Sequence, residues 1–359
     1  MPRRITLRDI AIKADVDIST VSRALHNSAS VHLETRAQIQ KIATDLGYRP
    51  DPALSALAAY RKSLQPSSSY QSTLAWLDNW PLRGAMREIQ SFNEYFLGAT
   101  ERANRYGYKL EEFFLRGKDM TPARMGSILR ARNIQGIIVP PQQHDGGKLD
   151  FDFTHFSAVA LGYSLRPALL HVVTNHQFLS ITLVVKKLRD LGYRRIALYL
   201  YADWDKKVNE GYSTGFLSAQ KNLPAKDRIP AYLYEGSESV AEEIIAAKFR
   251  DWFTRARPEV IITQGLYPEI VNWLKPLRIR VPRDVGIVDL STHPDKPQVS
   301  GIYQNDRLIG ATAADIVIGM LQRNEQGLPA TLIYTQVDGV WQPGESVRSI
   351  EGSIVRPHS

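Results

Sequence analysis

The 359-residue sequence contains no cysteine. Disulfide bonds, thiolate chemistry and cysteine-ligated zinc or iron–sulfur centres are therefore excluded. No apolar run approaches the roughly 18 residues that a membrane-spanning helix needs. Near the N-terminus, charged residues fall where a secretory signal peptide requires an uninterrupted apolar region: Asp9, Lys13, Asp15 and Asp17. We therefore expect a cytoplasmic protein with no membrane partner.

Motifs of the common enzyme and cofactor sites are also missing. Neither GxGxxG nor GxxxxGK(S/T) stands between a strand pattern and a helix pattern, so nucleotide binding is not indicated. The eight histidines are scattered, without HExxH or a readable Ser/His/Asp arrangement. We interpret His144 and the pair His171 and His176 as surface or core residues rather than ligands. The sequence thus disfavours an enzyme, and we expect no cofactor and no metal.

Positive charge is concentrated in the first sixth of the chain. The formal net charge of the whole sequence is +8, while residues 1–63 hold ten Lys or Arg and six Asp or Glu. Half of the excess charge therefore lies in this short segment. Net charge concerns association rather than fold, so the distribution favours an anionic partner for the N-terminal region.

The same region contains helical patterns separated by a tight turn. In TLRDIAIKA, residues 6–14, apolar residues follow the i, i+3, i+4, i+7 rule, and Thr6 is the expected N-cap. The turn ADVD follows, with Asp15 expected at a positive φ, which Asp tolerates better than most residues. A further amphipathic pattern in residues 33–47 ends at Gly47, the residue favoured just beyond a helix C-terminus.

Between them, DISTVSRALHNS at residues 17–28 divides into two faces at helical spacing. About 100° per residue separates an apolar side from a polar arc formed by Ser19, Ser22, Arg23 and His26. Small hydroxyls beside an arginine suit a face pressed against phosphates and base edges. An ordinary solvent-exposed helix is the alternative for this stretch taken alone. Helix, tight turn, helix and supporting helix within about 45 residues make the helix-turn-helix plan.

These residues resemble the DNA-binding headpiece of the LacI/GalR family of bacterial transcription regulators. The matching positions are Thr6, Leu7, Asp9, Ala11, Val16, residues 19–23, Asn27, Val31, Thr35, Arg36, residues 46–48 and Pro50. The resemblance implies a cytoplasmic, nucleoid-associated homodimer that binds a pseudo-palindromic operator in double-stranded DNA. It also implies control of that binding by a small-molecule effector.

In the resembled family, the positions of Ile18, Ser19 and Arg23 face base edges. An arginine that offers a bidentate fork to guanine contributes about 1–3 kcal/mol of discrimination. Ile18 lies between the polar and apolar arcs, so contact with a thymine methyl and completion of the core both remain open. The DNA-binding residues predicted in the headpiece are Thr6, Leu7, Ile18, Ser19, Thr20, Ser22, Arg23, His26, Val31, His32 and Thr35. Asp15 and His32 depart from the family, which usually has glycine and serine there.

Residues 51–61, DPALSALAAYR, begin with an Asp N-cap and Pro at the first helical position. A segment of this length cannot maintain a helix by itself in water. The resemblance implies a hinge that becomes helical on operator DNA and wedges a leucine into the minor groove. The predicted DNA-binding residues here are Leu54, Leu57 and Ala58; ordinary linker residues packed on the next domain are the alternative. Residues 63–72 then read as a flexible linker.

From residue 72 onward, apolar strand patterns alternate with amphipathic helix patterns. This alternation predicts α/β architecture with two parallel, doubly wound sheets covered on both faces. GYRRIAL, STGFLSA, VPRDVGIV and RLIGATAADIVIGML resemble parts of the family's periplasmic-binding-protein-like effector domain. The predicted division is a headpiece at 1–50, hinge helix and linker at 51–71, an N-terminal lobe at 72–168 plus 303–328, and a C-terminal lobe at 169–302 plus 329–350. The chain is expected to cross between lobes near 165–171, 299–304 and 329–334.

Two such lobes create a cleft at the carboxyl ends of their strands, where these folds bind ligands. Aromatic rings beside hydrogen-bonding side chains suit a sugar or sugar derivative, although loop residues without a ligand remain the alternative at each position. The predicted effector-binding residues are Asp78, Asn79, Gln142, Tyr163, Asn175, Trp204, Tyr212, Gln264 and Ser291. Tyr212 and Ser291 stand where the family often has arginine and aspartate, so its usual hexose contacts are not intact.

Together these features predict a dimeric, sequence-specific transcriptional regulator, of repressor type, whose effector changes the closure of the lobes. The alternative is a sugar-binding protein without a DNA role. The headpiece pattern disfavours that alternative.

Overall fold

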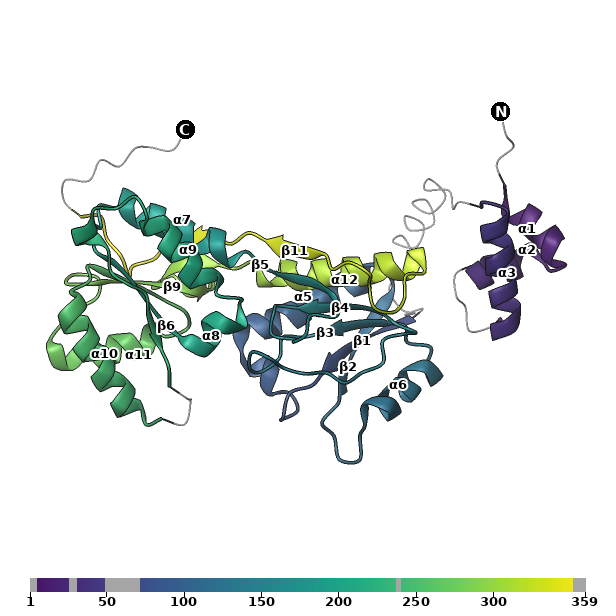
Figure 1. Ribbon diagram of the computed structural model, residues 1–359, viewed down its shortest axis with the longest axis horizontal. Coiled ribbons are helices and arrows are strands. Elements are labelled where there is room, and N and C mark those ends of the chain that lie inside the picture. Colours follow the sequence, from purple (N-terminus) through teal and green to yellow (C-terminus); the bar gives the residue numbers. More distant parts are fainter. Residues whose placement is uncertain (1–4, 26–30, 49–71, 237–239, 351–359) are drawn as a thin grey trace.

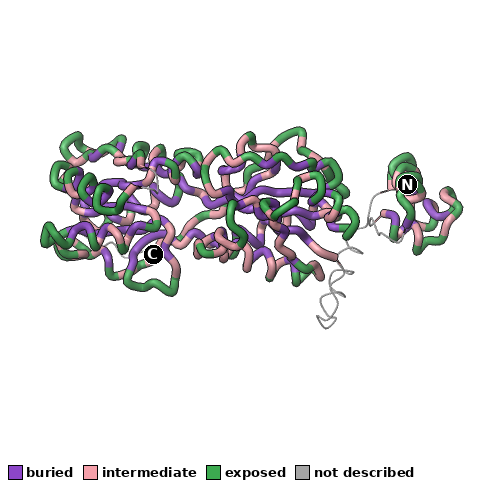
Figure 2. Tube along the Cα trace, turned by 90° about the horizontal axis from the view of Figure 1, so that it is seen from below, coloured by how far each residue is buried: buried purple, intermediate pink, exposed green. Residues whose placement is uncertain are grey.

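The computed structural model describes residues 5–25, 31–48, 72–236 and 240–350. Within these ranges a bundle of short helices is followed by two α/β lobes, which lie end to end in Figure 1. Buried residues run through the middle of both lobes, while exposed residues cover their outer helices (Figure 2). The predicted hinge and linker at 51–71 lie outside the described residues.

The N-terminal bundle consists of α1 (Leu7–Ala14), α2 (Ile18–Leu25) and α3 (Leu33–Asp45). Each helix contributes a fully or nearly fully buried side chain to a common core, formed around Ile10, Val21 and Ile39. This core is small, so the local ends of the helices matter for its stability. The three predicted helices and their packing into one bundle are confirmed.

Local capping explains where the bundle helices begin and end. Thr6 is the N-cap of α1, and the Asp9 carboxylate accepts hydrogen bonds from the Thr6 backbone N–H at 2.8 Å and its hydroxyl at 2.7 Å. Asp15 adopts the predicted positive φ, 52°. After α3, Gly47 has a φ of 69° and the Tyr48 N–H donates to the Ala43 carbonyl at 2.9 Å. This bond completes a Schellman-type helix end that a glycine accommodates without strain.

The first lobe contains a six-stranded sheet in the order β11-β5-β4-β3-β1-β2, with every neighbouring pair parallel. Its strands are β1 (Ser72–Asp78), β2 (Tyr108–Phe114), β3 (Gly136–Val139), β4 (Ser157–Leu161), β5 (His171–Asn175) and β11 (Tyr334–Val337). The covering helices are α5 (Gln90–Arg105), α6 (Pro122–Ala131) and α12 (Asp306–Arg323), with a short 3-10 turn at Ala85–Glu88.

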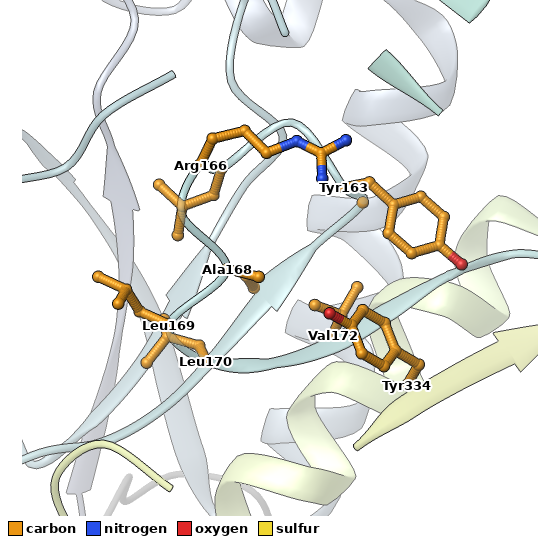
Figure 3. A pocket seen from close by; sticks show the side chains of 10 residues that line it. Tyr163, Arg166, Ala168, Leu169, Leu170, Val172 and Tyr334 are labelled. Atoms are coloured by element: carbon orange, nitrogen blue, oxygen red, sulfur yellow. The ribbon is translucent and has the colours of Figure 1, made fainter. Parts of the chain in front are cut away.

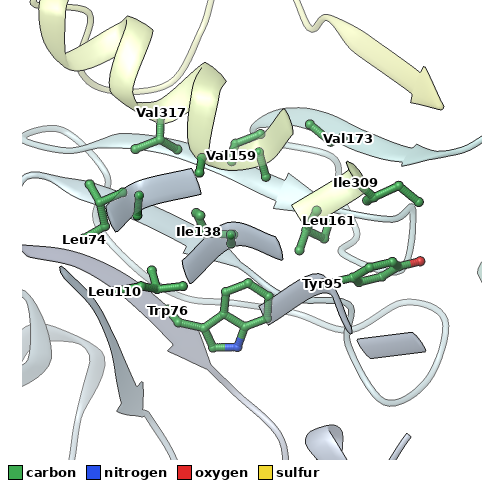
Figure 4. Close-up of a cluster of buried hydrophobic side chains, with 14 of the residues drawn as sticks. Leu74, Trp76, Tyr95, Leu110, Ile138, Val159, Leu161, Val173, Ile309 and Val317 are labelled. Carbon is green, nitrogen blue, oxygen red and sulfur yellow. The ribbon is translucent and has the colours of Figure 1, made fainter. Parts of the chain in front are cut away.

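Side chains alternate across this sheet and bury both of its faces. Leu74 and Trp76 of β1 join a core with α5 and α12, which Figure 4 shows in close-up. Ala75 and Leu77, the alternate residues, belong to a second core that includes α6. A parallel sheet covered on both sides in this way explains the nearly continuous apolar strand patterns.

Helices α5 and α12 approach each other closely through two glycines. A Cβ atom at Gly98 of α5 would collide with the backbone carbonyl of Arg307, and one at Gly310 of α12 with the carbonyl of Tyr95. Both obstacles are backbone atoms, which cannot rotate away. The absence of a side chain at these positions therefore sets the distance between the two helices.

The second lobe contains a six-stranded sheet in the order β12-β10-β9-β8-β6-β7. Its strands are β6 (Ile196–Tyr201), β7 (Tyr232–Tyr234), β8 (Val260–Thr263), β9 (Gly286–Thr292), β10 (Ser300–Tyr303) and β12 (Val340–Gln342). The helices are α7 (Gln177–Asp190), α8 (Ala202–Lys207), α9 (Gly211–Gln220), α10 (Glu242–Ala256) and α11 (Tyr267–Leu274), with 3-10 turns at Ala225–Asp227 and Lys275–Leu277. Because β12 runs antiparallel to β10, this sheet is mixed rather than purely parallel as predicted.

The chain passes between the lobes three times. The crossings lie between Asn175 and Gln177, between Tyr303 and Asp306, and between Val337 and Val340. The first lobe thus comprises residues 72–175 and 306–337, and the second comprises residues 177–303 and 340–350.

The predicted boundaries after residues 168 and 328 are wrong. β5 pairs with both β4 and β11, so both of these short strands belong to the first lobe. The predicted crossing near 299–304 falls on β10, which places residue 303 in the second lobe. β5 and β11 are only five and four residues long, and in the described chain no helix separates β5 from β4 or β11 from β12. The strand–helix alternation used to place the boundaries therefore does not mark these strands.

Candidate functional site

The polar arc predicted on α2 faces outward in the structure. Ser19 and Arg23 are exposed, while Val21 and Ala24 are buried in the bundle core. The Arg23 guanidinium lies along its own helix, where Nε donates to the Ser19 carbonyl at 3.1 Å and Nη2 donates to the Thr20 hydroxyl at 3.3 Å. These contacts orient a cation on the exposed face. The arrangement provides a helix with a charged, hydrogen-bonding surface of the width that a DNA major groove admits.

Burial distinguishes the apolar residues among those predicted to bind DNA. Ile18 is 47% exposed and lies outside the bundle core, so completion of the core is the wrong alternative for it. Val31 is 6% exposed and belongs to that core, so its side chain has little surface to offer to DNA. Leu7 is half-buried and packs against the same core. Val31 and part of the Leu7 side chain are thus buried by apolar packing at the ends of the helices.

The remaining predicted headpiece residues lie close to helix N-termini or on α2. Thr6 and His32 are exposed N-cap residues of α1 and α3, and Thr35 is half-buried in the first turn of α3. Exposed N-terminal turns present backbone N–H groups that favour anions. Thr20 and Ser22 are half-buried on α2. The other predicted DNA-binding residues, His26, Leu54, Leu57 and Ala58, lie outside the described residues.

At the crossings between the lobes, buried amides and a phenol form one hydrogen-bonded cluster. Asn175, at the end of β5, donates through Nδ2 to Gln304 Oε1 at 2.6 Å and to the Tyr212 hydroxyl at 3.4 Å. Gln304 Nε2 donates to the same hydroxyl at 2.9 Å. Gln177 Nε2 completes the cluster by donating to Asn175 Oδ1 at 2.6 Å. We call Asn175, Gln177, Tyr212 and Gln304 the crossing cluster.

Asn175 and Tyr212, both predicted as effector-binding residues, lie together in the crossing cluster, which occupies their polar atoms. Tyr212 is fully buried, and burial raises the pKa of its hydroxyl well above the ordinary value, so the phenol stays neutral. Gln304 and Gln177 were not among the predicted site residues. Gln304 lies just before the RLIGATAADIVIGML segment, and Gln177 is the first residue of α7 without any distinctive motif.

Buried carboxyl groups lie on both sides of the crossing cluster. Asp306, the first residue of α12, is 3% exposed; burial first and the neighbouring Glu94 second raise its pKa to about 7. Asp289 of β9 accepts hydrogen bonds from the Gly265 and Ser291 backbone N–H groups, both at 2.9 Å, while burial raises its pKa. The predicted residue Ser291 thus serves to hold Asp289 through its backbone.

Three of the predicted residues gather at the carboxyl ends of β1 and β3. Asp78 is fully buried, accepts a hydrogen bond from the Trp80 N–H at 2.9 Å, and has a pKa raised by burial. Asn79 Nδ2 donates to Gln142 Oε1 at 3.0 Å, which brings these two predicted residues together. This edge of the first lobe faces the boundary with the second, as the parallel topology predicts.

Tyr163 lies apart from the crossing cluster. Its hydroxyl accepts a hydrogen bond from Gln336 Nε2 at 2.8 Å, and its ring lies 5.9 Å from that of Tyr334 between centroids. Figure 3 shows these rings beside Arg166, around a pocket of about 20 Å³ that accommodates no more than a water molecule. Its predicted role as an effector contact is therefore not supported by this pocket.

The last predicted residues belong to the second lobe. Trp204 is half-buried on α8, and Gln264 is half-buried immediately after β8. On the same helix as Trp204, the sequence prediction missed Lys207, which is 6% exposed and donates to the Gln143 carbonyl of the first lobe at 2.9 Å. A lysine in the charged stretch DWDKK looks solvated in sequence, and only the packing of α8 reveals its burial.

Neither metal nor membrane geometry is found in the described part of the chain. No group of three or more His, Asp or Glu side chains there is arranged to hold a metal ion. Likewise, none of the described helices has both the length and the hydropathy needed to cross a bilayer.

Two family models match separate regions of the chain. The model for "Bacterial regulatory proteins, lacI family" matches residues 6–51, and the model for "Periplasmic binding protein-like domain" matches residues 185–338. Over 54 residues the chain is 50% identical to the HTH-type transcriptional regulator GalS of Salmonella typhimurium, covering 15% of this chain and 16% of that protein. The alignment thus spans about one sixth of the length of this curated relative.

Solved structures match over nearly the whole chain. A transcriptional regulator CelR–cellobiose complex is similar with a TM-score of 0.54 and 16% identity, covering 96% of this chain and 100% of that one. The lac repressor dimer bound to operator and the anti-inducer ONPF gives a TM-score of 0.53 and 16% identity, with 96% and 99% coverage. These likenesses confirm the predicted fold class, a helix-turn-helix headpiece followed by a two-lobed periplasmic-binding-protein-like domain.

Proposed function

We propose that the chain is a sequence-specific DNA-binding transcriptional repressor of the LacI type, in line with the two family models and the relative that it matches. In this proposal the headpiece reads a pseudo-palindromic operator as part of a homodimer, since two half-sites in fixed register call for two related headpieces. Proteins of this family are regulators, and we assign no catalytic residue.

The exposed polar face of α2 is the observation that carries the proposal. Its two buried residues, Val21 and Ala24, fix the helix on the bundle, and the opposite side presents Ser19 and Arg23 to solvent. Arg23 supplies the bidentate donor that reads guanine, and Ser19 reaches a base or a phosphate. Exposed Ile18 beside them is available for a thymine methyl.

We further propose that the boundary between the lobes takes a small-molecule effector, a sugar or sugar derivative. Asp78, Asn79 and Gln142 bring carboxylate and amide groups to this boundary, and Trp204 adds an aromatic face. Sugars bind where directional hydrogen bonds combine with apolar ring surfaces. The cellobiose in the similar CelR structure supports this class of ligand. Closure of the lobes around the crossing cluster would then change the spacing of the two headpieces.

The function is tested by selection of fragments from genomic DNA with the purified full-length protein. We expect a small set of enriched fragments that share a pseudo-palindromic sequence, and the Arg23→Ala variant should fail to enrich them. Binding to a selected fragment should weaken steeply with added salt, because phosphate contacts release counterions. Enrichment no greater than for random DNA would refute the proposal.

A further inference from the structure

The Lys207 ammonium group, at the end of α8, lies in the boundary between the two lobes. It belongs to the second lobe, yet its Nζ donates to the backbone carbonyl of Gln143 in the first lobe at 2.9 Å. Only 6% of the residue is exposed. A lysine normally keeps its ammonium in water, so this placement needs compensating contacts.

Aromatic rings from both lobes supply those contacts. Nζ lies 5.0 Å from the ring centroid of Phe92 and 5.8 Å from that of Trp80, which belong to the first lobe, and 5.0 Å from that of Trp204 in the second lobe. All three distances are within the range of cation–π attraction. We call Trp80, Phe92 and Trp204 the ammonium cage.

The walls of the ammonium cage are fixed by their own contacts. Trp80 is 6% exposed, its indole N–H donates to the Pro141 carbonyl at 2.7 Å, and its ring meets that of Phe92 edge-on at 6.1 Å between centroids. The cage is therefore a built feature of the first lobe onto which Trp204 closes. A preorganised aromatic site of this kind recognises an alkylammonium group.

Further contacts across the same boundary involve the segment around α8. Arg166 of the first lobe donates through Nη2 to Asn209 Oδ1 at 3.3 Å, and His144 Nδ1 lies 3.5 Å from Asp203 Oδ2. Figure 1 shows α8 between the two lobes. The His144–Asp203 pair is more than half exposed, so solvent weakens it, whereas Lys207 is shielded.

We propose that the ammonium cage is an alkylammonium-binding site whose ligand in this structure is the chain's own Lys207. Seated there, Lys207 links the two lobes without any external molecule. An effector that opens or rearranges the boundary has to displace this ammonium from the cage. The proposal rests in part on the proposed effector site, with which the cage shares Trp204, and it is independent of the DNA-binding function.

The proposal is tested with spin labels on the full-length protein. The sequence has no cysteine, so labels attach only at introduced sites, such as Ala123→Cys on α6 and Ala247→Cys on α10. Both alanines are exposed, and their helices lie on the side of the lobes opposite β11 (Figure 1). Pulsed electron resonance then measures the distance between the lobes in the absence of DNA.

We expect a single narrow distance distribution in the parent protein and a shift to longer, broader distances in Lys207→Ala. Lys206→Ala is the matched control, because Lys206 is exposed on the same helix and should leave the distribution unchanged. Phe92→Leu removes a cage wall from the opposite lobe while keeping the lysine, and it should also shift the distribution. If Lys207→Ala fails to fold, the Phe92→Leu variant provides the test of the proposal instead.

Chemical rescue tests the ligand class directly. Added n-butylammonium should return the Lys207→Ala distribution toward the narrow form, while n-butanol at the same concentration should not. Unchanged distances in both Lys207→Ala and Phe92→Leu would overturn the proposal. Equal effects of the amine and the alcohol would overturn its assignment to ammonium recognition.

Discussion

The Asn175 side-chain amide donates to Gln304 Oε1 across 2.6 Å, which joins the first crossing between the lobes directly to the second. Tyr212, from a helix of the second lobe, accepts a hydrogen bond from each of these two amides. The crossing cluster therefore ties together two of the segments that pass between the lobes and one helix of the second lobe.

Tyr212→Phe should destabilise the protein by about 1–3 kcal/mol, because two buried amide donors lose their common acceptor. Urea unfolding of the full-length protein measures the change. Tyr106→Phe is the control, since Tyr106 is exposed at the end of α5. Equal losses in the two variants would show that the crossing cluster adds no stability.

Asp306→Asn should flatten the dependence of stability on pH. The carboxyl has a pKa of about 7 in the folded protein against an ordinary value of 3.8. Between these values the folded state binds a proton that the unfolded state has released, so this group makes the free energy of unfolding fall as pH rises. Replacement by Asn removes that loss, which amounts to at most about 4 kcal/mol above pH 7.

Thermal or urea unfolding at pH 5 and pH 8 distinguishes the two forms of residue 306. The variant should gain up to about 4 kcal/mol over the parent at pH 8 and less than half of that at pH 5. Asp251→Asn, at an exposed position of α10, serves as the control and should leave the pH dependence as it is. If Asp306→Asn lost the same stability at both pH values, the raised pKa of Asp306 would be contradicted.

Gly310→Ala should destabilise the first lobe by about 1–3 kcal/mol through overpacking, because the new Cβ meets the Tyr95 carbonyl of α5. Gly319→Ala on the same helix meets only the movable end of Arg323. That control should be neutral or slightly stabilising, since alanine favours a helix over glycine. Calorimetry measures the transition temperature of each variant. Equal transition temperatures for Gly310→Ala and Gly319→Ala would contradict the close packing of α5 and α12.

Arg23→Ala and Arg23→Lys should both lose about 1–3 kcal/mol of discrimination for the operator, because a lysine keeps the charge but cannot offer the bidentate fork. Binding of Arg23→Lys to unrelated DNA should change little. Gel-shift titrations on selected and scrambled fragments measure both quantities. Full specificity in Arg23→Lys would mean that this residue contacts phosphate only.

Leu57→Ala should weaken operator binding by about tenfold or more while sparing binding to unrelated DNA, since a minor-groove wedge acts only where the duplex is kinked. This prediction comes from the resemblance of the hinge sequence, and Leu57 lies outside the described residues. Titrations on both DNAs, with DNA bending measured on the operator, test it. Equal losses on the two DNAs would remove the wedge role.

Sequence was most informative where local physical rules fix the structure. The cap at Thr6, the positive φ of Asp15 and the two faces of α2 each follow from neighbouring residues, and the structure confirms them. The pairing of Asn79 with Gln142 was also within reach, because they follow β1 and β3, and the carboxyl ends of neighbouring parallel strands meet at one edge of the sheet.

Features that depend on long-range packing were not predictable in this way. β11 joins the first sheet by pairing with β5, which lies far earlier in the chain, and no local pattern records this pairing. Lys207 is buried only because α8 meets rings from the opposite lobe. Val31 was assigned to DNA by its place in a family motif, although the small bundle needs it as core.

The most direct test is footprinting of a selected genomic fragment with the full-length protein and with a form lacking residues 1–62. The account predicts two protected half-sites related by a pseudo-twofold axis for the full chain. The shortened form should leave the fragment unprotected while still unfolding cooperatively. Protection of the same half-sites by the shortened form would contradict it.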